Sequence, residues 1–296
     1  MFPTCRYCSP SLLRLLSFII LAGVVLVSCG PSTNKPAAST SPYERAAEAF
    51  KKGQLDDALS LTDKLARATP PADSTERARV LRAVIYTGEL KAATELAAAY
   101  DKGAENSKNP QFQAAYRRLH SDNLSIAARA ALNLAETTHQ LAPDGVIAKE
   151  LTLEASFPTT EGPTAIKQLA RVLEGGWIES DDQEAAQTDA VRKGIDEALA
   201  EVVSGDRAKA RHALASGSTK LEGADFAIFL AKELAEGATV FDRHHGRDPQ
   251  KMLTLCNEGD VAVKAALAQL KDKPDKDLEK EAKKIQDQFK TIRKDK

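Results

Sequence analysis

Aromatic residues are scarce in this sequence of 296 residues: Phe, Tyr and Trp together make up 5%, and there is one Trp. A strand-rich fold is therefore disfavoured, because strands are enriched in aromatic and β-branched residues. An excess of charge of one sign is also missing, since 41 Lys and Arg stand against 42 Asp and Glu. This balance excludes a domain that binds nucleic acid mainly through its electrostatics. The abundant Ala, Leu, Glu and Lys are instead typical of a mostly helical protein.

An apolar run long enough to span a membrane is missing as well. The main apolar run, 15–27 (LLSFIILAGVVLV), is short, because a membrane-spanning helix needs about 20 such residues. Arg6 and Arg14 precede this run. A basic start followed by an apolar run of this length is the layout of a secretory signal peptide.

The apolar run ends in the segment 26–30 (LVSCG), which resembles the lipobox of bacterial lipoproteins. The resemblance implies removal of residues 1–28 as a signal peptide and transfer of lipid to Cys29 and to the new N-terminus. Several acyl chains on one residue give the stable anchoring that a single chain does not. Gly30 is not the aspartate that retains lipoproteins in the inner membrane of enteric bacteria, which favours an outer membrane, facing the periplasm. The alternative is an uncleaved anchor with an incidental cysteine.

Lipidation would leave little cysteine chemistry in the mature chain. Cys5 and Cys8 would leave with the signal peptide and Cys29 would carry the lipid, so no internal disulfide could form. Cys256 lies in an apolar helical context and is predicted to be a small core residue rather than a reactive thiol. Residues 29–42 are rich in Pro, Ser, Thr and Ala, and we expect them to form a flexible linker between lipid and folded body.

A period of 35 residues begins after the linker. The segment 41–44 (SPYE) is a capping box that predicts a helix start. Gly53 and Gly88 lie 35 residues apart, and each is predicted to form the turn between two helices. Asn123 takes the place of the glycine in a weaker third copy. A fixed period of this size is typical of stacked helix pairs.

The stretch 53–58 (GQLDDA), followed at some distance by Pro70, resembles the turn and second helix of a tetratricopeptide repeat (TPR), whose unit has about 34 residues. The resemblance implies an all-α fold, a TPR-like superhelix or solenoid of antiparallel helix pairs. We assign 43–143 to TPR-like repeats and 144–296 to a C-terminal helical region with irregular TPR-like hairpins. The first predicted helix lacks the large aromatic residue of the family. An irregular helical bundle with coincidental spacing is the alternative.

Two local patterns organise the second half. The stretch 204–210 (SGDRAKA) repeats the turn spacing, and Asn257 takes the glycine position in a weaker copy that ends at Pro274. The last segment carries an apolar stripe at spacings of four and three residues, formed by Leu278, Ala282, Ile285, Phe289 and Ile292. Such a stripe suits a capping helix that covers the last apolar face of a solenoid.

Motifs for nucleotide binding, zinc-dependent proteolysis or serine hydrolysis are missing, so we predict no catalytic, cofactor-binding or metal site. His244 and His245 are adjacent, and we interpret them as the cationic end of a helix rather than as metal ligands. The acidic run 179–184 is interpreted as the N-terminal charges of a helix over 182–203. Trp177 is interpreted as buried between the two halves, with an exposed binding anchor as the alternative.

Alignment on the turn residues places four side chains toward the concave groove that holds a partner in TPR arrays: Arg82, Tyr86, Arg117 and His120. Two arginines with an aromatic ring would suit an acidic or C-terminal carboxylate ligand. We therefore expect an envelope lipoprotein, anchored through Cys29, that acts as a protein-protein interaction scaffold or adaptor and is not an enzyme. A periplasmic solute-binding or transport accessory protein with a pocket between helices is the alternative.

Overall fold

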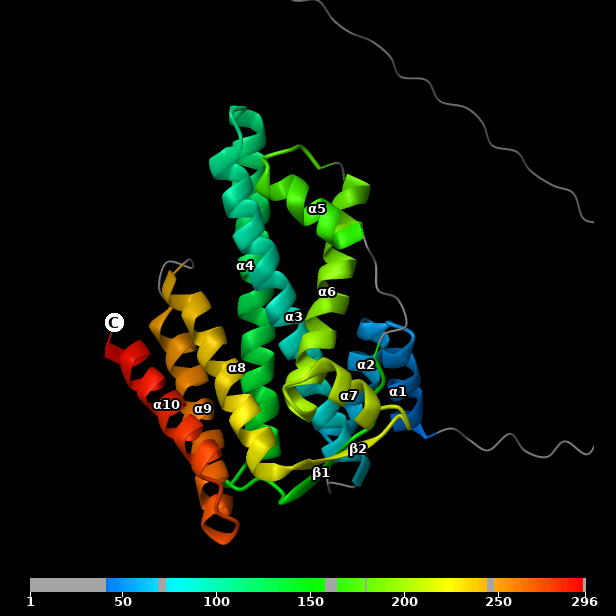
Figure 1. The fold of residues 1–296 in the computed structure, drawn as a ribbon, viewed down its shortest axis with the longest axis vertical. Helices are drawn as coiled ribbons and strands as arrows, with labels where there is room; N and C mark the ends of the chain where they lie inside the picture. The colour runs from blue at the N-terminus through cyan, green and yellow to red at the C-terminus, as the bar shows by residue number, and fades with distance from the viewer. Residues whose placement is uncertain (1–40, 69–72, 158–163, 179, 244–247, 295–296) are drawn as a thin grey trace, which may run out of the picture. The chain divides into compact units, whose positions relative to one another are not determined.

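A computed structural model describes residues 41–68, 73–157, 164–178, 180–243 and 248–294. Its first two helices, α1 (Pro42–Lys51) and α2 (Leu55–Ala66), form the predicted hairpin (Figure 1). The Glu44 N–H donates to Ser41 Oγ at 3.1 Å, and the Ser41 N–H donates to the Glu44 carboxylate at 2.7 Å. Gly53 has a φ of 75°, a conformation that glycine adopts without steric cost. The predicted capping box and the first predicted turn are confirmed.

The next two helices are longer than predicted. α3 (Asp73–Asn106) and α4 (Pro110–Leu141) lie side by side and antiparallel, with a short connection. The predicted turns at Gly88 and Asn123 are wrong, because both residues lie inside these continuous helices. Asn123 is accommodated there because its side-chain amide donates to the Leu119 carbonyl oxygen of the preceding turn at 2.8 Å.

Gly88 lies at a helix crossing instead of a turn. α6 (Ser180–Val203) crosses α3 at this point, and Gly194 of α6 lies against Gly88. A Cβ on Gly88 would lie 2.8 Å from the backbone nitrogen of Ile195, and one on Gly194 would overlap the Gly88 carbonyl oxygen. The two glycines therefore let the helix backbones approach more closely than side chains would allow.

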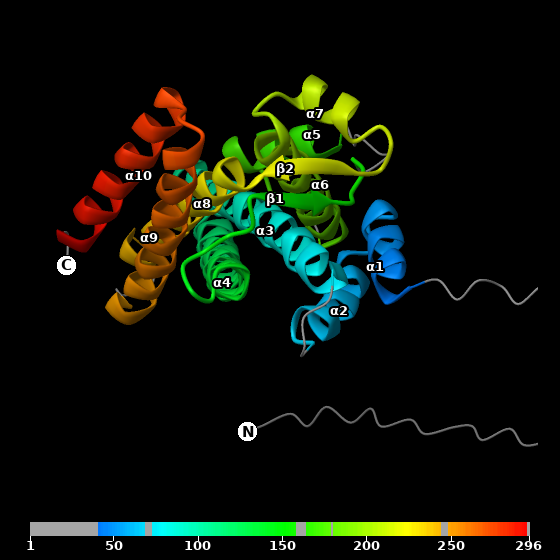
Figure 2. The same ribbon diagram turned by 90° about the horizontal axis from the view of Figure 1, so that it is seen from below.

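A two-stranded sheet departs from the predicted all-α class. β1 (Glu150–Leu153) pairs antiparallel with β2 (Thr219–Glu222), with Leu151 opposite Leu221 (Figure 2). Both leucines are buried, whereas Glu150 and Glu222, the pair at one end of the ladder, are exposed. The sheet thus has one face in the core and the other toward solvent, as strand alternation requires.

Between the two strands the chain forms α5, α6 and α7. α5 (Thr164–Leu173) contacts α3 and α6, and α7 (Arg207–Ala213) contacts α6. The turn predicted before α7 is confirmed, since Gly205 has a φ of 70°. Asp206 then caps α7 by accepting the Lys209 N–H at 2.8 Å.

The last three helices are α8 (Gly223–Arg243), α9 (Pro249–Asp272) and α10 (Lys276–Lys294). α8 contacts α9, and α10 contacts both of them (Figure 1). The turn predicted at Asn257 is wrong, because α9 continues through it. The chain does turn at Pro274, which lies between the end of α9 and the start of α10.

The predicted C-terminal amphipathic helix is confirmed as α10. Its stripe residues Ala282, Ile285 and Phe289 are buried against the neighbouring helices. The Phe289 ring lies against Gly259 of α9, where a Cβ would overlap it. Because Gly259 has no side chain, the Phe289 ring, the largest apolar group of α10, can pack directly against the backbone of α9.

One hydrophobic core joins the two predicted halves. It extends from Phe50 in α1 to Phe289 in α10 and includes buried residues from both sides of position 143. Cys256 belongs to this core and is buried, as predicted. A second cluster around Tyr100 and Tyr116, whose ring centroids are 6.3 Å apart, joins one end of α3 and α4 to α5 and α6.

Contacts between helices are not limited to neighbours in sequence. α3 contacts α2 and α4, but also α6 and β1, and α4 contacts α8 and α9. In a solenoid each repeat contacts only its neighbours. A mostly helical protein with antiparallel helix pairs is therefore confirmed, while a solenoid is not shown. No helix in the described ranges is long and apolar enough to cross a membrane.

Candidate functional site

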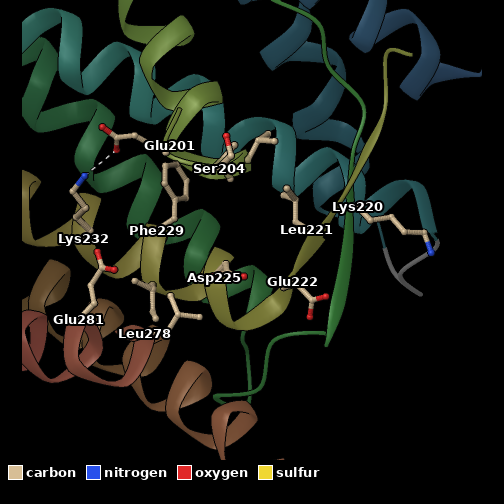
Figure 3. A pocket seen from close by; sticks show the side chains of 14 residues that line it. Glu201, Ser204, Lys220, Leu221, Glu222, Asp225, Phe229, Lys232, Leu278 and Glu281 are labelled. Carbon is tan, nitrogen blue, oxygen red and sulfur yellow. Dashed lines mark hydrogen bonds and ion pairs between the residues drawn. The ribbon is translucent and has the colours of Figure 1, made fainter. Parts of the chain in front are cut away.

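A cleft of about 440 Å³ lies between the C-terminal end of α6, β2, the first turns of α8 and the side of α10 (Figure 3). We call it the α10 cleft. Its floor consists of buried apolar side chains, namely Val202, Leu221, Ile228 and Phe229. Its rim carries the charged side chains Glu201, Lys220, Glu222, Asp225, Lys232 and Glu281. An apolar floor with a charged rim is the usual character of a ligand site on a protein surface.

The local sequence explains how the cleft forms. α6 ends in the tight turn at Gly205, which leaves the end of the helix open beside β2. β2 directs Leu221 inward by strand alternation. The strand then passes directly into α8 at Gly223, where a Cβ would overlap the Ala148 carbonyl oxygen. This close approach holds the first turns of α8 next to the sheet and exposes one side of Phe229 to the cleft.

The rim has an acidic character around Asp225. Burial raises the pKa of the Asp225 carboxyl, and the nearby carboxylates of Glu222 and Asp275 raise it further. The ammonium group of Lys273 opposes this effect but does not cancel it. The cleft therefore holds carboxylate charge that its own lysines do not fully balance.

Glu201 and Lys232 of the rim belong to an ion network that joins α3, α6 and α8 and is buried at Lys91 and Glu233. We call it the Lys91 network, and its members are Lys91, Glu201, Lys232, Glu233 and Glu236. Lys91 Nζ lies 3.2 Å from Glu201 Oε1, 3.1 Å from Glu233 Oε1 and 3.8 Å from Glu236 Oε2. Lys232 Nζ lies 3.1 Å from Glu201 Oε2. The side chain of Glu233 is fully buried and that of Lys91 is 12% exposed.

Glu233 is the member of the network that holds a proton near neutral pH. Burial raises the pKa of its carboxyl to about 8, and Glu236 and Glu201 add to this rise against the opposing effect of Lys91. With Glu233 protonated, two ammonium groups balance two carboxylates, so the network is neutral.

The raised pKa of Glu233 predicts how stability depends on pH. The unfolded chain releases this proton near pH 4.5 and the folded chain near pH 8, so stability should fall as pH rises between these values. Between pH 5.5 and 8.5 the native chain should lose of the order of 2 kcal/mol in free energy of unfolding through this group. We expect Glu233→Gln to remove this loss, measured by urea unfolding at the two pH values. Glu236→Gln, at a more exposed position of the same network, should keep most of the loss, because burial is the larger cause of the raised pKa of Glu233 and the charge of Glu236 a smaller one. Equal pH dependence of Glu233→Gln and the native chain would contradict the assignment.

Glu89 contributes to the same pH dependence. Burial raises the pKa of its carboxyl to about 7, against the opposing charge of Arg129. Glu89 therefore also lowers the stability of the folded chain as pH rises. Its contribution is complete near pH 7, about one pH unit below that of Glu233. A residual slope below pH 7 in Glu233→Gln is therefore expected from Glu89.

Two of the four predicted groove residues are buried. Arg82 and Tyr86 are 2% and 8% exposed on α3. Arg82 Nη1 lies 3.1 Å from Asp63 Oδ1 on α2, and Arg82 Nη2 donates to Tyr86 Oη at 3.3 Å. The guanidinium also stands over the Tyr86 ring at 5.6 Å. Arg82 thus joins α3 to α2, with the Tyr86 ring against its guanidinium group.

The other two predicted groove residues lie on α4. Arg117 is exposed. His120, one turn later, is half-buried, and its Nδ1 lies 2.8 Å from the Ala97 carbonyl oxygen of α3. Of the four predicted groove residues, Arg82 and Tyr86 contact each other, Arg117 lies on the surface and His120 contacts α3. Binding of a carboxylate ligand by these residues stays a prediction.

The remaining candidate residues have varied positions. Trp177 is 41% exposed, so its predicted burial is wrong, and its ring stacks on Phe112 with centroids 4.6 Å apart. Asp181 and Asp182 lie in the first turn of α6, which confirms their role as N-terminal charges. Cys29 and the linker up to residue 40 lie outside the described residues, as do His244 and His245.

Sequence reasoning missed the Lys91 network. A signal for it was present, because Lys232 and Glu233 interrupt the apolar stretch 226–241 of α8. Adjacent charges of opposite sign inside such a stretch indicate buried pairing. Lys91 and Glu201 gave a weaker signal, since each is a single charge flanked by apolar residues and its partner lies on another helix.

Comparison with known proteins gives no identification. No family model matches the chain, and neither a curated protein nor a solved structure matches it.

Proposed function

We propose that this protein is a lipid-anchored lipoprotein of the bacterial cell envelope that acts as an interaction scaffold or adaptor for another protein. The anchor is supported by the lipobox resemblance at 26–30, and we place it in the outer membrane, facing the periplasm. The α10 cleft is the observation that carries the scaffold role, because it offers an apolar floor and a charged rim at the surface. We propose no catalytic role, since no catalytic motif is present.

We further propose that the helix pairs are divergent TPR-like hairpins. The α1–α2 hairpin supports this relation, with glycine at position 53 and the buried Ala58 where the two helices approach. The turn at Gly205 before α7 has the same spacing of glycine and alanine. In this proposal the later helices have diverged from the superhelical order of the family.

Loss of the anchor is expected from Cys29→Ala. Without the thiol no diacylglyceryl group can be attached, so the precursor should accumulate unprocessed and migrate more slowly in electrophoresis. Metabolic labelling with a palmitate analogue should be lost in the same variant. Cys256→Ala is the matched control and should leave both labelling and migration unchanged. Unchanged migration and labelling of Cys29→Ala would overturn the lipoprotein proposal.

The scaffold role is tested by chemical crosslinking of the full chain in native membranes. We expect one protein complex to be captured reproducibly. The same complex should be lost when the membranes are first solubilised and diluted and the crosslinker is added afterwards. Capture of no complex at any crosslinker length would overturn the scaffold role while leaving the anchor intact.

A solute-binding or transport accessory role is the second candidate. It is favoured by the volume of the α10 cleft, about 440 Å³, which lies within the range of small-molecule sites. Native mass spectrometry with a library of periplasmic solutes separates the two candidates. A stoichiometric complex with one small solute would favour this second role.

A further inference from the structure

Both lysines on the rim of the α10 cleft are already engaged. Lys220 Nζ donates to Glu150 Oε1 at 2.6 Å, and in Figure 3 its side chain points away from the other labelled residues. Lys232 Nζ donates to Glu201 Oε2 at 3.1 Å. Neither ammonium group is therefore available to balance the remaining carboxylates of the rim.

Two of those carboxylates, Asp225 and Glu281, have no ion pair and no side-chain hydrogen bond within the described part of the chain. They belong to different helices, α8 and α10, and both line the cleft beside Phe229 (Figure 3). The negative charge of Glu281 adds to the effects that raise the pKa of Asp225, because like charges repel. A cation placed between them would relieve this repulsion.

The cleft continues along α10 in both directions. A cavity of about 410 Å³ shares Leu278 with it, and another of about 580 Å³ shares Glu281. The lining residues on α10 extend from Asp277 to Gln288, a rise of about 17 Å along the helix. An extended segment of about five residues has this length.

We propose that the α10 cleft binds an extended basic segment of a partner protein. A lysine or arginine of that segment lies between Asp225 and Glu281, and an adjacent apolar side chain covers Leu221 and Phe229. The two unbalanced carboxylates require a positive charge on the partner segment. The apolar floor requires an apolar side chain next to that charge. This inference depends on the proposed scaffold function and specifies the chemistry of its partner.

Simple cations fit the cleft less well than a chain segment does. No group of three or more possible metal ligands occurs among the described residues. A small organic amine would satisfy the carboxylates but leave the apolar floor and the two adjoining cavities uncovered. A chain segment that places one basic side chain at Asp225 and Glu281 and an apolar one on the floor satisfies the first two features. Its remaining residues cover the adjoining cavities, which Lys273 and Lys280 also line.

The test uses the full lipidated chain in phosphatidylcholine nanodiscs, with empty discs as background. The probe is a fluorescein-labelled octapeptide in which lysine alternates with valine and serine, followed by fluorescence anisotropy. We expect saturable binding that weakens as salt is raised, because the contact depends on exposed charges. A peptide with glutamate in place of each lysine should not bind, and equal binding of the two peptides would overturn the proposal.

Charge reversal locates the binding site. The double variant Asp225→Lys, Glu281→Lys should raise the Kd of the basic peptide at least tenfold. The matched control Asp101→Lys, Glu105→Lys changes the charge by the same amount at two exposed positions of α3 and should stay within twofold of the native value. Circular dichroism melting verifies that both double variants are folded. Equal Kd values for the two double variants would overturn the proposal.

Two further outcomes separate this proposal from others. Displacement of the peptide by free spermine at lower concentration than by unlabelled peptide would make the cleft a polyamine site and overturn the partner segment. If charge reversal leaves the membrane crosslinks of the full chain intact, the cleft proposal fails and the scaffold role stands. If peptide binding depends on Asp225 and Glu281 but no complex is crosslinked in membranes, the scaffold role fails and the basic specificity of the cleft stands.

Discussion

Gly194→Val is expected to lower the free energy of unfolding by about 3 kcal/mol, measured as a reduced urea midpoint. The new Cβ would overlap the carbonyl oxygen of Gly88 and lie 3.2 Å from the Ala92 nitrogen. Both contacts are with backbone atoms of α3, which cannot rotate away as a side chain can. Relief therefore requires α3 and α6 to separate, and this exposes part of the core that they share. Removing a glycine from a helix favours folding by less than about 1 kcal/mol and does not compensate.

The matched control for this prediction is Ala98→Val, at an exposed position of α3. It introduces the same side chain into a helix and should change the stability by no more than about 0.5 kcal/mol. Gly88→Val should cost nearly as much as Gly194→Val, and the two should not add, because they disrupt one contact. Equal urea midpoints for Gly194→Val and Ala98→Val would show that the helix crossing does not need the two glycines.

This crossing also shows why the helix boundaries of the second repeat could not be predicted. Glycine suits a turn because it adopts positive φ, and it suits a helix crossing because it has no side chain. Gly53 has the first role and Gly88 the second, although both occur in similar local sequence. The partner that decides between the roles, Gly194, is far away in the sequence. Only tertiary structure distinguishes the two.

Elements with complete local signals were predicted correctly. The apolar stripe of α10 contains the whole pattern that buries the helix, so its position needed no long-range information. The strands β1 and β2 gave a weak signal, because each has four residues and Lys220 and Glu222 make β2 largely polar. They pair across the intervening helices α5 to α7, and this pairing is a property of the assembled fold.

The burial of Arg82 and Tyr86 and the α10 cleft were not predicted from the sequence. The groove residues were chosen by transferring a repeat register to α3, and that register fails once α3 continues through Gly88. Arg82 then faces α2 instead of solvent. The α10 cleft gathers residues from α6, β2, α8 and α10, and no local pattern brings such distant segments together. Its acidic side chains are ordinary surface residues until the fold places them around one apolar floor.

Lys91→Met should be the most destabilising single change in the ion network, with an expected cost of about 3–5 kcal/mol at pH 8.5. Methionine keeps the length of the side chain and its apolar stem, so the loss of packing is small. The change removes the ammonium group that contacts Glu201, Glu233 and Glu236 and leaves carboxylate charge uncompensated between α3, α6 and α8. The cost should be smaller at pH 5.5, where Glu233 keeps its proton.

The matched control is Lys193→Met, which removes another lysine that joins α3 to α6. Lys193 Nζ lies 2.6 Å from Glu95 Oε1, closer than any contact of Lys91, but the Lys193 side chain is 50% exposed. Exposed ion pairs contribute about 0–1 kcal/mol, because water solvates both charges when the pair is broken. Lys193→Met should therefore cost less than Lys91→Met, although Lys193 makes the shorter contact. Urea unfolding of both variants at pH 5.5 and 8.5 decides the matter: similar losses would mean that distance, and not burial, sets the contribution of these ion pairs.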